Sequence, residues 1–279
     1  MNEKNDGSLR KLQAVNLAMI KIFIGICKKH HLCYYALGGT LLGAVRHQGF
    51  IPWDDDVDIG MPRPDYERFL KIAENELPEG YRLRTIDVDD EYRTYFVKIE
   101  DTNVRLMREY YAKNAVVQKA VYAWIDVMPI DGAPDGQAAL AAHVDKLKQM
   151  RRMISYSLLD KCMGTGKKRS KKQMFFMKAG FQTGVYRLFN TQKLFEKFDR
   201  ECRRFPYETS EVIGNPYGIY GIREFVPREV FGKGVGLAFE DITIQAPEDY
   251  DSYLKSIYGD YMALPPENER TGHRIEFAE

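Results

Sequence analysis

The chain has 279 residues, of which 44% are hydrophobic, so it can bury a substantial core as one large domain or as one domain with a helical insertion. Its 41 lysines and arginines nearly balance its 40 aspartates and glutamates, and the resulting net charge of +1 provides no overall field that would favour nucleic acid. The sequence contains no uninterrupted apolar run of about twenty residues, which a membrane-spanning helix requires.

The N-terminal segment has the pattern of an amphipathic packing helix. Apolar side chains recur at helical spacing at Leu9, Leu12, Leu17, Ile20, Phe23, Ile24 and Cys27. Lysines at Lys21, Lys28 and Lys29 charge the remaining surface. The uncharged stretch inside this segment, residues 12–20, is too short to cross a bilayer.

The cysteines favour a reduced, cytoplasmic protein, because they form no C-x-x-C pair and follow no signal peptide. The four are Cys27, Cys33, Cys162 and Cys202. A zinc site formed by Cys27, His30, His31 and Cys33 is the alternative to ordinary helix and helix-end positions for these residues.

A glycine turn follows the first short strand expected in the chain. Residues 34–37 form that strand, Gly38 and Gly39 interrupt it, and Thr40 is placed to cap a helix that begins at Leu41. Glycines let a phosphate approach the backbone closely, and the free N–H groups of a helix start supply donors. The turn therefore predicts a phosphate site; a turn without a binding role is the alternative for this motif taken alone.

Two aspartates alternate with apolar residues immediately downstream. Residues 56–59 (DVDI) have the period of a half-buried strand, which directs Asp56 and Asp58 to one face. Since same-face Cα atoms of a strand lie roughly 6.5 Å apart, both carboxylates can ligate one Mg²⁺ or bridge two ions. The alternative is an acidic turn that leads into a strand, and Asp54 and Asp55 are assigned to that turn.

The pattern of helices and strands continues to the middle of the chain. A helix is predicted over residues 64–77, and strands are predicted over residues 81–86, 94–100, 104–107 and 122–130. Lys98 alternates with apolar neighbours in one of these strands. It either faces the site and touches a donor phosphate or lies on the solvent-exposed face of the strand.

The last of these strands carries a third carboxylate of interest. Asp126 interrupts a strongly apolar run, and an unpaired carboxylate there would be costly, so a bound cation is its expected partner. The alternative is an edge position in which Asp126 pairs with an arginine or lysine. Asp131 precedes Gly132 and is assigned to a turn.

From about residue 136 the sequence changes to long helical patterns, with a break at Gly164-Thr165-Gly166. The break is not a P-loop, because that motif requires glycine and Ser or Thr where the chain has Lys161 and Lys168. We expect a turn between two helices instead. Its basic residues, beside the MFFM stretch at 174–177, are suited to an anionic membrane surface or a lipid-linked acceptor, and a solvated helical hairpin is the alternative. These basic residues are Lys167, Lys168, Arg169, Lys171 and Lys172.

The last third returns to mixed structure. Residues 215–221 are turn-rich and aromatic, which suits a pocket wall or a packed surface loop. Residues 236–244 alternate as one strand, and residues 247–249 open a helix that ends near Gly259. Arg270 and His273 then fall on an irregular tail, which we expect to dock over the donor site.

Together these motifs resemble the LicD-type family of phosphocholine transferases, which includes the fukutin-related proteins and belongs to the nucleotidyltransferase-fold superfamily. The resemblance covers residues 38–43 (GGTLLG), 46–61, 124–132 and the stretch from Tyr258 through Arg270 and His273. It implies an α+β fold with a nucleotidyltransferase-like mixed sheet flanked by helices, and it leaves the donor and acceptor open. Relatives of this family move phosphocholine or phosphorylated alditols from cytidine diphosphate carriers.

On this interpretation the chain divides into three parts. Residues 1–135 form the catalytic core, residues 136–205 form a helical insertion that contacts an acceptor or a membrane surface, and residues 206–279 complete the core and the donor site. Asp56 and Asp58 hold Mg²⁺, or Mn²⁺ in its place, and Asp126 is a third ligand or the general base. The donor phosphates are expected to contact Gly38, Gly39, Thr40, Arg46 and Lys98, with a surface position as the alternative for Arg46.

The predicted reaction is transfer of a phospho-alcohol from CDP-choline or a CDP-alditol to a hydroxyl of a cell-surface glycan, teichoic-acid precursor or other lipid-linked acceptor, with release of CMP. The protein is expected to be cytoplasmic, with peripheral contact at the inner face of the membrane. Two alternatives stay open: nucleotidyl transfer with release of pyrophosphate, and a non-catalytic module that binds nucleotide or metal. The complete set of aspartates counts against the second.

Overall fold

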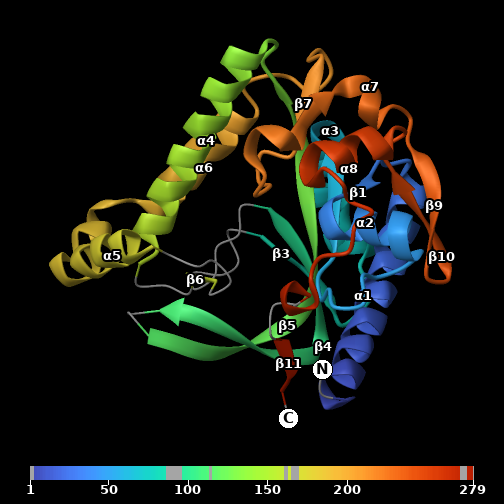
Figure 1. Cartoon of the computed structure of the whole chain (residues 1–279), viewed down its shortest axis with the longest axis horizontal. Helices are drawn as coiled ribbons and strands as arrows, with labels where there is room; N and C mark the ends of the chain where they lie inside the picture. Colours follow the sequence, from blue (N-terminus) through green and yellow to red (C-terminus); the bar gives the residue numbers. More distant parts are fainter. Residues whose placement is uncertain are drawn as a thin grey trace.

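The computed structural model describes residues 3–85, 96–112, 115–159, 163–164, 170–270 and 275–278. A strongly curved mixed sheet lies at the centre, with helices on both sides of it (Figure 1). The α+β fold predicted from the sequence is thereby confirmed. Among the described residues, no helix has the length and apolar character needed to cross a membrane.

The main path of the sheet has the strand order β1-β2-β5-β4-β11. β2 and β5 run parallel, whereas the other neighbouring pairs along this path are antiparallel. The predicted motifs at residues 56–61 and 122–130 therefore meet in adjacent strands through residues 58–61 of the first, while Asp56 and Val57 precede β2. The five strands are β1 (Tyr35–Ala36), β2 (Asp58–Pro62), β5 (Ala115–Ala133), β4 (Val97–Ala112) and β11 (Ile275–Phe277).

β4 and β5 form a long hairpin. Their pairing register shifts between Asp101 and Arg105, and this bulge lets one strand continue where two strands, residues 94–100 and 104–107, were predicted. Shorter strands extend the sheet on either side. β3 (Tyr81–Arg84) and β6 (Met163–Gly164) pair with β4, β7 (Val212–Gly214) pairs with β5, and β8 (Phe225–Pro227) pairs with β7.

Helices α1 (Glu3–His30) and α3 (Arg63–Glu76) pack against the sheet at β2 and β5. The apolar stripe predicted for α1 is buried, since Leu12, Phe23 and Cys27 are at most 3% exposed. The zinc alternative finds no support among the described residues, whose one candidate metal group lies elsewhere. Cys27, Cys33 and Cys202 are free thiols, and Cys162 lies outside the described residues.

The predicted helical insertion is a projecting arm of the molecule, formed by α4, α5, η1 and α6 (Figure 1). A second hydrophobic cluster joins this arm to the sheet, and Leu147 of α4, Phe198 of α6 and Met128 of β5 all belong to it. The arm consists of α4 (Gln137–Ser157), α5 (Lys171–Thr183), the 3-10 helix η1 (Val185–Leu188) and α6 (Thr191–Cys202).

A buried ion pair reinforces this junction. Arg63 of α3 donates to both carboxylate oxygens of Asp131, at 2.6 and 2.5 Å, and to Asp199 of α6 at 3.3 Å. The assignment of Asp131 to a turn is wrong, because β5 continues through Ala133 and Asp131 is only 2% exposed. An aspartate before a glycine has the local signature of a turn, but the distant arginine makes it a core residue.

The C-terminal part contains a hairpin, not the single strand predicted over residues 236–244. β9 (Val235–Phe239) pairs with β10 (Ile242–Ala246), and the chain turns at Glu240, whose φ is +51°. Alternation of polar and apolar residues is the same in both strands, which concealed the turn between them. The predicted helix from residue 249 to Gly259 is confirmed as α8 (Tyr250–Tyr258).

Regular structure also occurs in the tail that was predicted to be irregular. It contains the 3-10 helix η3 (Glu267–Glu269) and ends in β11, which pairs with β4. Pairing with β4 satisfies the backbone of this short segment and accounts for its order without any ligand. Two further short elements, η2 (Gly221–Glu224) and α7 (Arg228–Phe231), precede the hairpin.

Candidate active site

Asp58 and Asp126 lie opposite one another in adjacent strands. The parallel register of β2 and β5 pairs Asp58 with Asp126, and the antiparallel register of β4 and β5 pairs Lys98 with Asp126. Register partners direct their side chains to the same face of a sheet. One face therefore gathers two carboxylates and one ammonium group from three consecutive strands.

A second group of carboxylates immediately precedes β2. Oxygen atoms of Asp54, Asp55 and Asp56 lie within 4.8 Å of one another, which makes them the one candidate metal-binding group found in the described part of the chain. The backbone does turn here, since the Asp54 N–H donates to the Ile51 carbonyl at 2.9 Å. Sequence reasoning assigned Asp54 and Asp55 only to the turn and missed that their carboxylates lie beside that of Asp56.

Two buried amides of α1 hold this aspartate turn in place. Gln13 donates to the carbonyls of Ile51 and Asp54 at 3.2 and 2.8 Å, and Asn16 donates to the carbonyl of Asp55 at 3.2 Å. Gln13 and Asn16 are 3% and 1% exposed. The one signal in the sequence is that Gln13 and Asn16 are amides inside the uncharged stretch of a predicted packing helix. Helical periodicity alone does not distinguish such amides from other residues of a packing surface.

The glycine turn packs directly against the carboxylates. Gly38 has a φ of +51°, and a Cβ at this position would lie 3.0 Å from Asp58 Oδ2. A Cβ at Gly39 would overlap Asp54 Oδ2. Residues with side chains therefore do not fit here, and the start of α2 (Gly38–His47) lies close to the aspartates. The free N–H groups at the start of α2 therefore lie next to the carboxylates of Asp54 and Asp58.

Thr40 is not the cap of this helix. α2 begins at Gly38, and its N-cap residue, Leu37, makes no side-chain cap. Thr40 lies within the first turn, is 5% exposed, and accepts the backbone N–H of Asp58 through Oγ1 at 2.9 Å. The pairing of β1 with β2 brings that N–H next to Thr40, so the hydroxyl links the glycine turn to the first residue of β2.

Asp58 lies in a strongly acidic environment that a bound cation would neutralise. Burial raises the pKa of the Asp58 carboxyl well above its ordinary value, and the negative charges of Asp56, Asp126 and Asp54 raise it further, whereas Lys98 lowers it. Oxygen ligands crowded at one place are the donor set that Mg²⁺ and other hard cations prefer. The residues present therefore fit the metal expected from the sequence.

Lys98 is buried, so the solvent-exposed alternative for this residue is wrong. It is 3% exposed, forms an ion pair with Asp126, and lies with its ammonium 4.5 Å from the ring centroid of Trp124. Asp126 combines features of both predictions made for it. It lies inside the sheet, between β2 and β4, and yet it pairs with a lysine.

Arg46 is half-buried near the end of α2 and contacts the segment after α8. Its Nη1 donates to the carbonyls of Tyr261 and Ala263 at 2.8 and 3.3 Å. The guanidinium therefore positions the chain that follows Gly259. A contact of Arg46 with the donor pyrophosphate stays a prediction.

Arg270 lies beside the aspartate turn. Its guanidinium carbon is 5.4 Å from the ring centroid of Trp53, the residue before Asp54, and its Nε donates to the Pro265 carbonyl at 2.9 Å. The tail thus runs past the site, as the docking prediction requires, although contact with a donor stays a prediction. His273 lies outside the described residues.

Two tyrosines that the sequence did not single out adjoin the site. The rings of Tyr220 and Tyr258 meet edge to face at 5.2 Å, and the Tyr258 hydroxyl is 3.8 Å from where a Cβ of Gly38 would be. Burial raises the pKa of both phenols, and the charge of Asp58 adds to the rise. Tyr220 belongs to the aromatic segment 215–221, so this end of the segment adjoins the site.

That segment is held by a buried carboxylate and by α4. Glu224 accepts the backbone N–H of Tyr220 at 3.2 Å, and burial raises the pKa of Glu224 to about 7. Arg151 of α4 donates to the carbonyls of Tyr217 and Gly218 at 2.8 and 3.0 Å. The position of Tyr220 thus depends on side chains from η2 and from the insertion.

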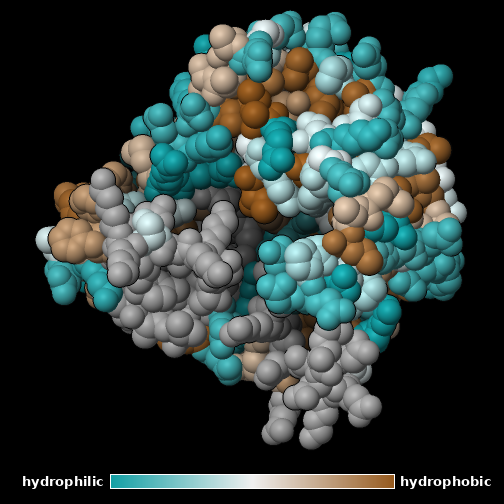
Figure 2. Space-filling view, in the orientation of Figure 1, coloured by the Kyte–Doolittle hydropathy of each residue, from teal (hydrophilic) through white to brown (hydrophobic). Residues whose placement is uncertain are grey.

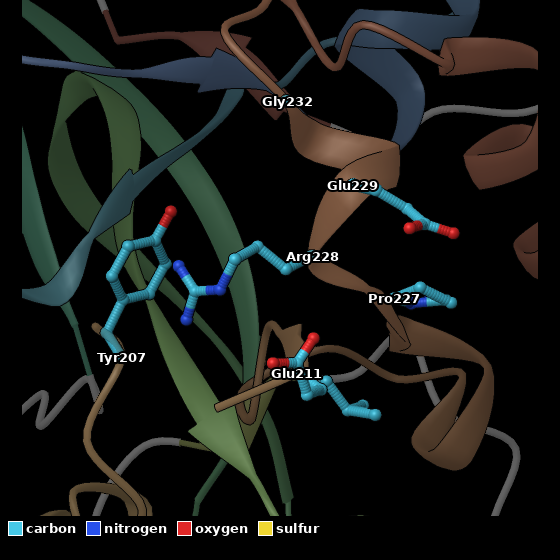
Figure 3. Close-up of a pocket in the computed structure, with 7 residues that line it drawn as sticks. Tyr207, Glu211, Pro227, Arg228, Glu229 and Gly232 are labelled. Carbon is cyan, nitrogen blue, oxygen red and sulfur yellow. The ribbon is translucent and has the colours of Figure 1, made fainter. Parts of the chain in front are cut away.

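A cavity of about 530 Å³ lies apart from the aspartates, next to α7 (Figure 3). Arg228 points toward Tyr207, with its guanidinium carbon 4.6 Å from the ring centroid, and its Nε donates to the Ser210 carbonyl at 2.8 Å. Glu211 and Glu229 also line the cavity. No predicted donor or metal residue is among its lining residues, so the predicted chemistry is not placed in this cavity.

Comparison with known proteins finds a matching domain in the part of the chain that holds most of these residues. Residues 31–130, which include the glycine turn, the aspartate turn, Lys98 and Asp126, match the family described as LicD/FKTN/FKRP, nucleotidyltransferase domain. The resemblance stated from the motifs is confirmed over these residues.

One curated relative is similar over nearly the whole chain. The lipopolysaccharide cholinephosphotransferase LicD of Haemophilus influenzae is 28% identical over 278 residues, which cover 97% of each protein. The human ribitol 5-phosphate transferase FKRP is 29% identical over 108 residues, which cover 37% of this chain and 21% of FKRP. These relatives thus include one named as a transferase of phosphocholine and one named as a transferase of ribitol phosphate.

Proposed function

We propose that the protein is a metal-dependent phosphotransferase that moves phosphocholine, or a related alcohol phosphate or alditol phosphate, from a CDP-linked donor to a hydroxyl group of a cell-surface glycan or teichoic-acid precursor. The observation that carries this proposal is the likeness to a cholinephosphotransferase over 97% of both chains. The similarity to a ribitol 5-phosphate transferase keeps alditol phosphates within the proposed substrate class.

The aspartates would hold the cation. Asp56 and Asp58 are the proposed ligands, and Asp54 is close enough to Asp56 to join them. When bound, Mg²⁺ or Mn²⁺ would neutralise the pyrophosphate of the donor and the negative charge that develops on the departing phosphate. The raised pKa of Asp58 supports this assignment, because a cation relieves the repulsion among these carboxylates.

The start of α2 would bind the transferred phosphate. Gly38 and Gly39 leave room for close approach, and the first N–H groups of the helix are free to donate to phosphate oxygens. Lys98 is ion-paired with Asp126, so it fixes the position of that carboxylate beside Asp58. Asp126 then serves as a further ligand or takes the proton of the attacking hydroxyl.

The bond changes follow from this arrangement. The acceptor oxygen attacks the β-phosphorus of the CDP-linked donor and loses its proton, and the bond from that phosphorus to the bridging oxygen breaks. A phosphodiester forms between the alcohol and the acceptor, and CMP leaves with the bridging oxygen. Catalysis rests on positioning and charge neutralisation, which are the tasks that the glycine turn and the carboxylates can perform.

A second candidate is nucleotidyl transfer, which the description of the matching domain as a nucleotidyltransferase favours. In that reaction the acceptor attacks the α-phosphorus of a nucleoside triphosphate and pyrophosphate leaves. The two reactions use the same residues and differ in the donor and in the phosphorus that is attacked.

Phosphorus-31 NMR separates the candidates. The protein is incubated with Mg²⁺ and, in turn, CDP-choline, CDP-ribitol, CTP, ATP and UTP, with and without a glycan acceptor. We expect CMP to form from a CDP-linked donor, together with a phosphodiester signal when the acceptor is present. Pyrophosphate formed from a triphosphate would establish the second candidate, and donor binding without any turnover would indicate a regulatory module.

A thermal shift measurement provides an independent readout. CDP-choline or CDP-ribitol should raise the Tm in the presence of Mg²⁺ and should have little effect in EDTA, because donor and cation bind together. Stabilisation by ATP or UTP but not by the cytidine compounds would contradict the proposal.

A further inference from the structure

One stretch of the helical insertion, residues 161–195, carries charge of one sign. Between Lys161 and Phe195 the chain has nine lysines and arginines and no aspartate or glutamate, whereas the whole chain has a net charge of only +1. α5 begins with Lys171 and Lys172, and Lys178 on the same helix is exposed. A surface with this composition attracts anionic partners.

Large apolar side chains are exposed in the same region. Phe175 and Phe176 of α5 are 68% and 57% exposed, and Leu188 of η1 is 82% exposed. Five of the eight large hydrophobic side chains that are exposed in the described part of the chain belong to α4, α5 and η1. Such a concentration marks a contact surface, because isolated apolar residues elsewhere need no partner.

The opposite side of these helices is packed. Gly180 of α5 is buried next to the ring of Tyr156 of α4, and Phe181 stacks on Tyr186 at 5.9 Å. Tyr186 is 4% exposed. Packing on this side fixes α5 and η1 and leaves Phe175 and Phe176 pointing to solvent, with their rings 5.8 Å apart.

α5 lies at the far end of the insertion, at the edge of the molecule (Figure 1). In the space-filling view, hydrophobic residues gather at this extremity, with hydrophilic residues beside them (Figure 2). A protruding end can meet an extended surface without interference from the rest of the molecule. This location, together with the exposed side chains, defines an α5–η1 surface formed by Phe175, Phe176, Lys178 and Leu188.

We propose that the α5–η1 surface binds the surface of an anionic lipid bilayer. Basic side chains interact with anionic head groups, and phenylalanine and leucine side chains enter the boundary between head groups and acyl chains. A second copy of the chain is disfavoured as the occupant, because two such surfaces would bring like charges together. A hydrophilic polyanion would match the charge but would leave the phenylalanines and Leu188 exposed.

Flotation with vesicles tests the proposal with the full-length protein. Vesicles of phosphatidylcholine alone are compared with vesicles that also contain phosphatidylglycerol. We expect binding to the anionic vesicles, and we expect raising the salt from about 0.1 M to about 0.5 M to weaken it, because the Debye length shortens. Equal binding to both vesicles, or binding to neither, would overturn the proposal.

Two sets of substitutions separate the contributions of charge and apolar contact. Replacing Lys171, Lys172 and Lys178 with Gln should weaken binding about fivefold per charge. The double variant Phe175→Ser/Phe176→Ser should weaken it by at least about tenfold. Binding unchanged in either set would overturn the proposal, and loss with the lysine set alone would indicate a hydrophilic polyanion site instead.

Matched controls lie elsewhere on the surface. Lys28→Gln on α1 and Leu264→Ser in the tail remove an exposed charge and an exposed apolar side chain, and neither should change vesicle binding. Every variant should keep the Tm of the parent protein, because substitutions of exposed side chains such as Phe175, Phe176 and Lys178 usually change stability little. A concentration-dependent dimer that Phe175→Ser/Phe176→Ser abolishes, without vesicle binding, would assign the surface to a second copy.

Discussion

The aspartate site and the α5–η1 surface differ in the sign and the burial of their charged groups. At the site, carboxylates from β2, β5 and the preceding turn are drawn together and partly buried, with Lys98 as a neighbouring cation. On α5 and η1, positive charge and apolar rings are left at the surface. Crowding like charges out of water favours a small bound cation, whereas spreading them at a surface favours a broad anionic partner. Whether a cluster of charged residues suits a small ion or a broad surface therefore depends on how deeply the cluster is buried.

The largest expected effect follows from removing one carboxylate of the site. Asp58→Asn, or Asp56→Asn, should lower turnover by at least about 100-fold at saturating Mg²⁺, because each removes a proposed ligand charge with little change of volume. In EDTA the Tm of Asp58→Asn should equal or exceed that of the parent protein, since the repelled charge is gone. Rates of CMP release and thermal melts measure the two effects.

Controls for this prediction come from the insertion. Asp145→Asn removes an exposed charge of α4, and Phe175→Ser alters the α5–η1 surface, so both should leave turnover with a soluble acceptor unchanged. Full activity of Asp58→Asn and Asp56→Asn would remove the metal assignment and, with it, the contrast between the two regions.

One buried ion pair reinforces the contact between the helical arm and the sheet, and a single substitution can break it. Asp131→Asn should lower the free energy of unfolding by about 3–5 kcal/mol, because among the described residues it leaves the buried guanidinium of Arg63 with the partly exposed Asp199 as its anionic partner. Asp145→Asn, which removes an exposed pair with Lys148, should cost less than about 1 kcal/mol. Urea unfolding compares the two variants, and equal costs would show that burial does not set the difference.

Glu224 should make the loop beside the site sensitive to pH. Its pKa in the folded protein is about 7, above the ordinary value of 4.5, so the folded state binds its proton more tightly than the unfolded state does. The contribution of Glu224 to stability should therefore be largest below about pH 4.5 and should fall by up to about 3 kcal/mol as the pH rises through 7.

Glu224→Gln tests this assignment, because glutamine keeps an acceptor for the Tyr220 N–H and does not titrate. The difference in unfolding free energy between the parent protein and the variant should change between about pH 5 and about pH 8. A constant difference over that range would show that the folded state does not retain the proton.

The smallest expected effect distinguishes a glycine that meets the site from one that does not. Gly39→Ala should lower turnover about tenfold, since its Cβ would displace the carboxylate of Asp54. Gly25→Ala in α1 has open space around the new Cβ and should stabilise the helix by roughly 0.5–1 kcal/mol with no loss of turnover. Equal turnover of the two variants would argue against contact between the glycine turn and the reacting groups.

Local patterns predicted the strands and the pattern of burial around the candidate site. Alternation in residues 56–59 is confirmed in the structure, where Val57 and Ile59 are buried and Asp56 and Asp58 are only partly so. The apolar run around Asp126 predicted an interior strand for the same reason: periodicity reports which face of a strand is buried. Thr40, Asp131 and the strand over residues 236–244 were misassigned, because in each case a contact with another segment, or a turn within an alternating pattern, determined the outcome.

The sequence by itself determined most of the elements and the character of their faces, since hydrophobic period, glycine and charge act over a few residues. It could not determine that Lys98 would pair with Asp126, that Gln13 and Asn16 would hold the aspartate turn, or that Tyr220 and Tyr258 would adjoin Asp58. Those contacts join residues far apart in the chain and depend on strand register and helix packing. Only the tertiary structure sets them, because burial and electrostatic coupling arise after the elements have come together.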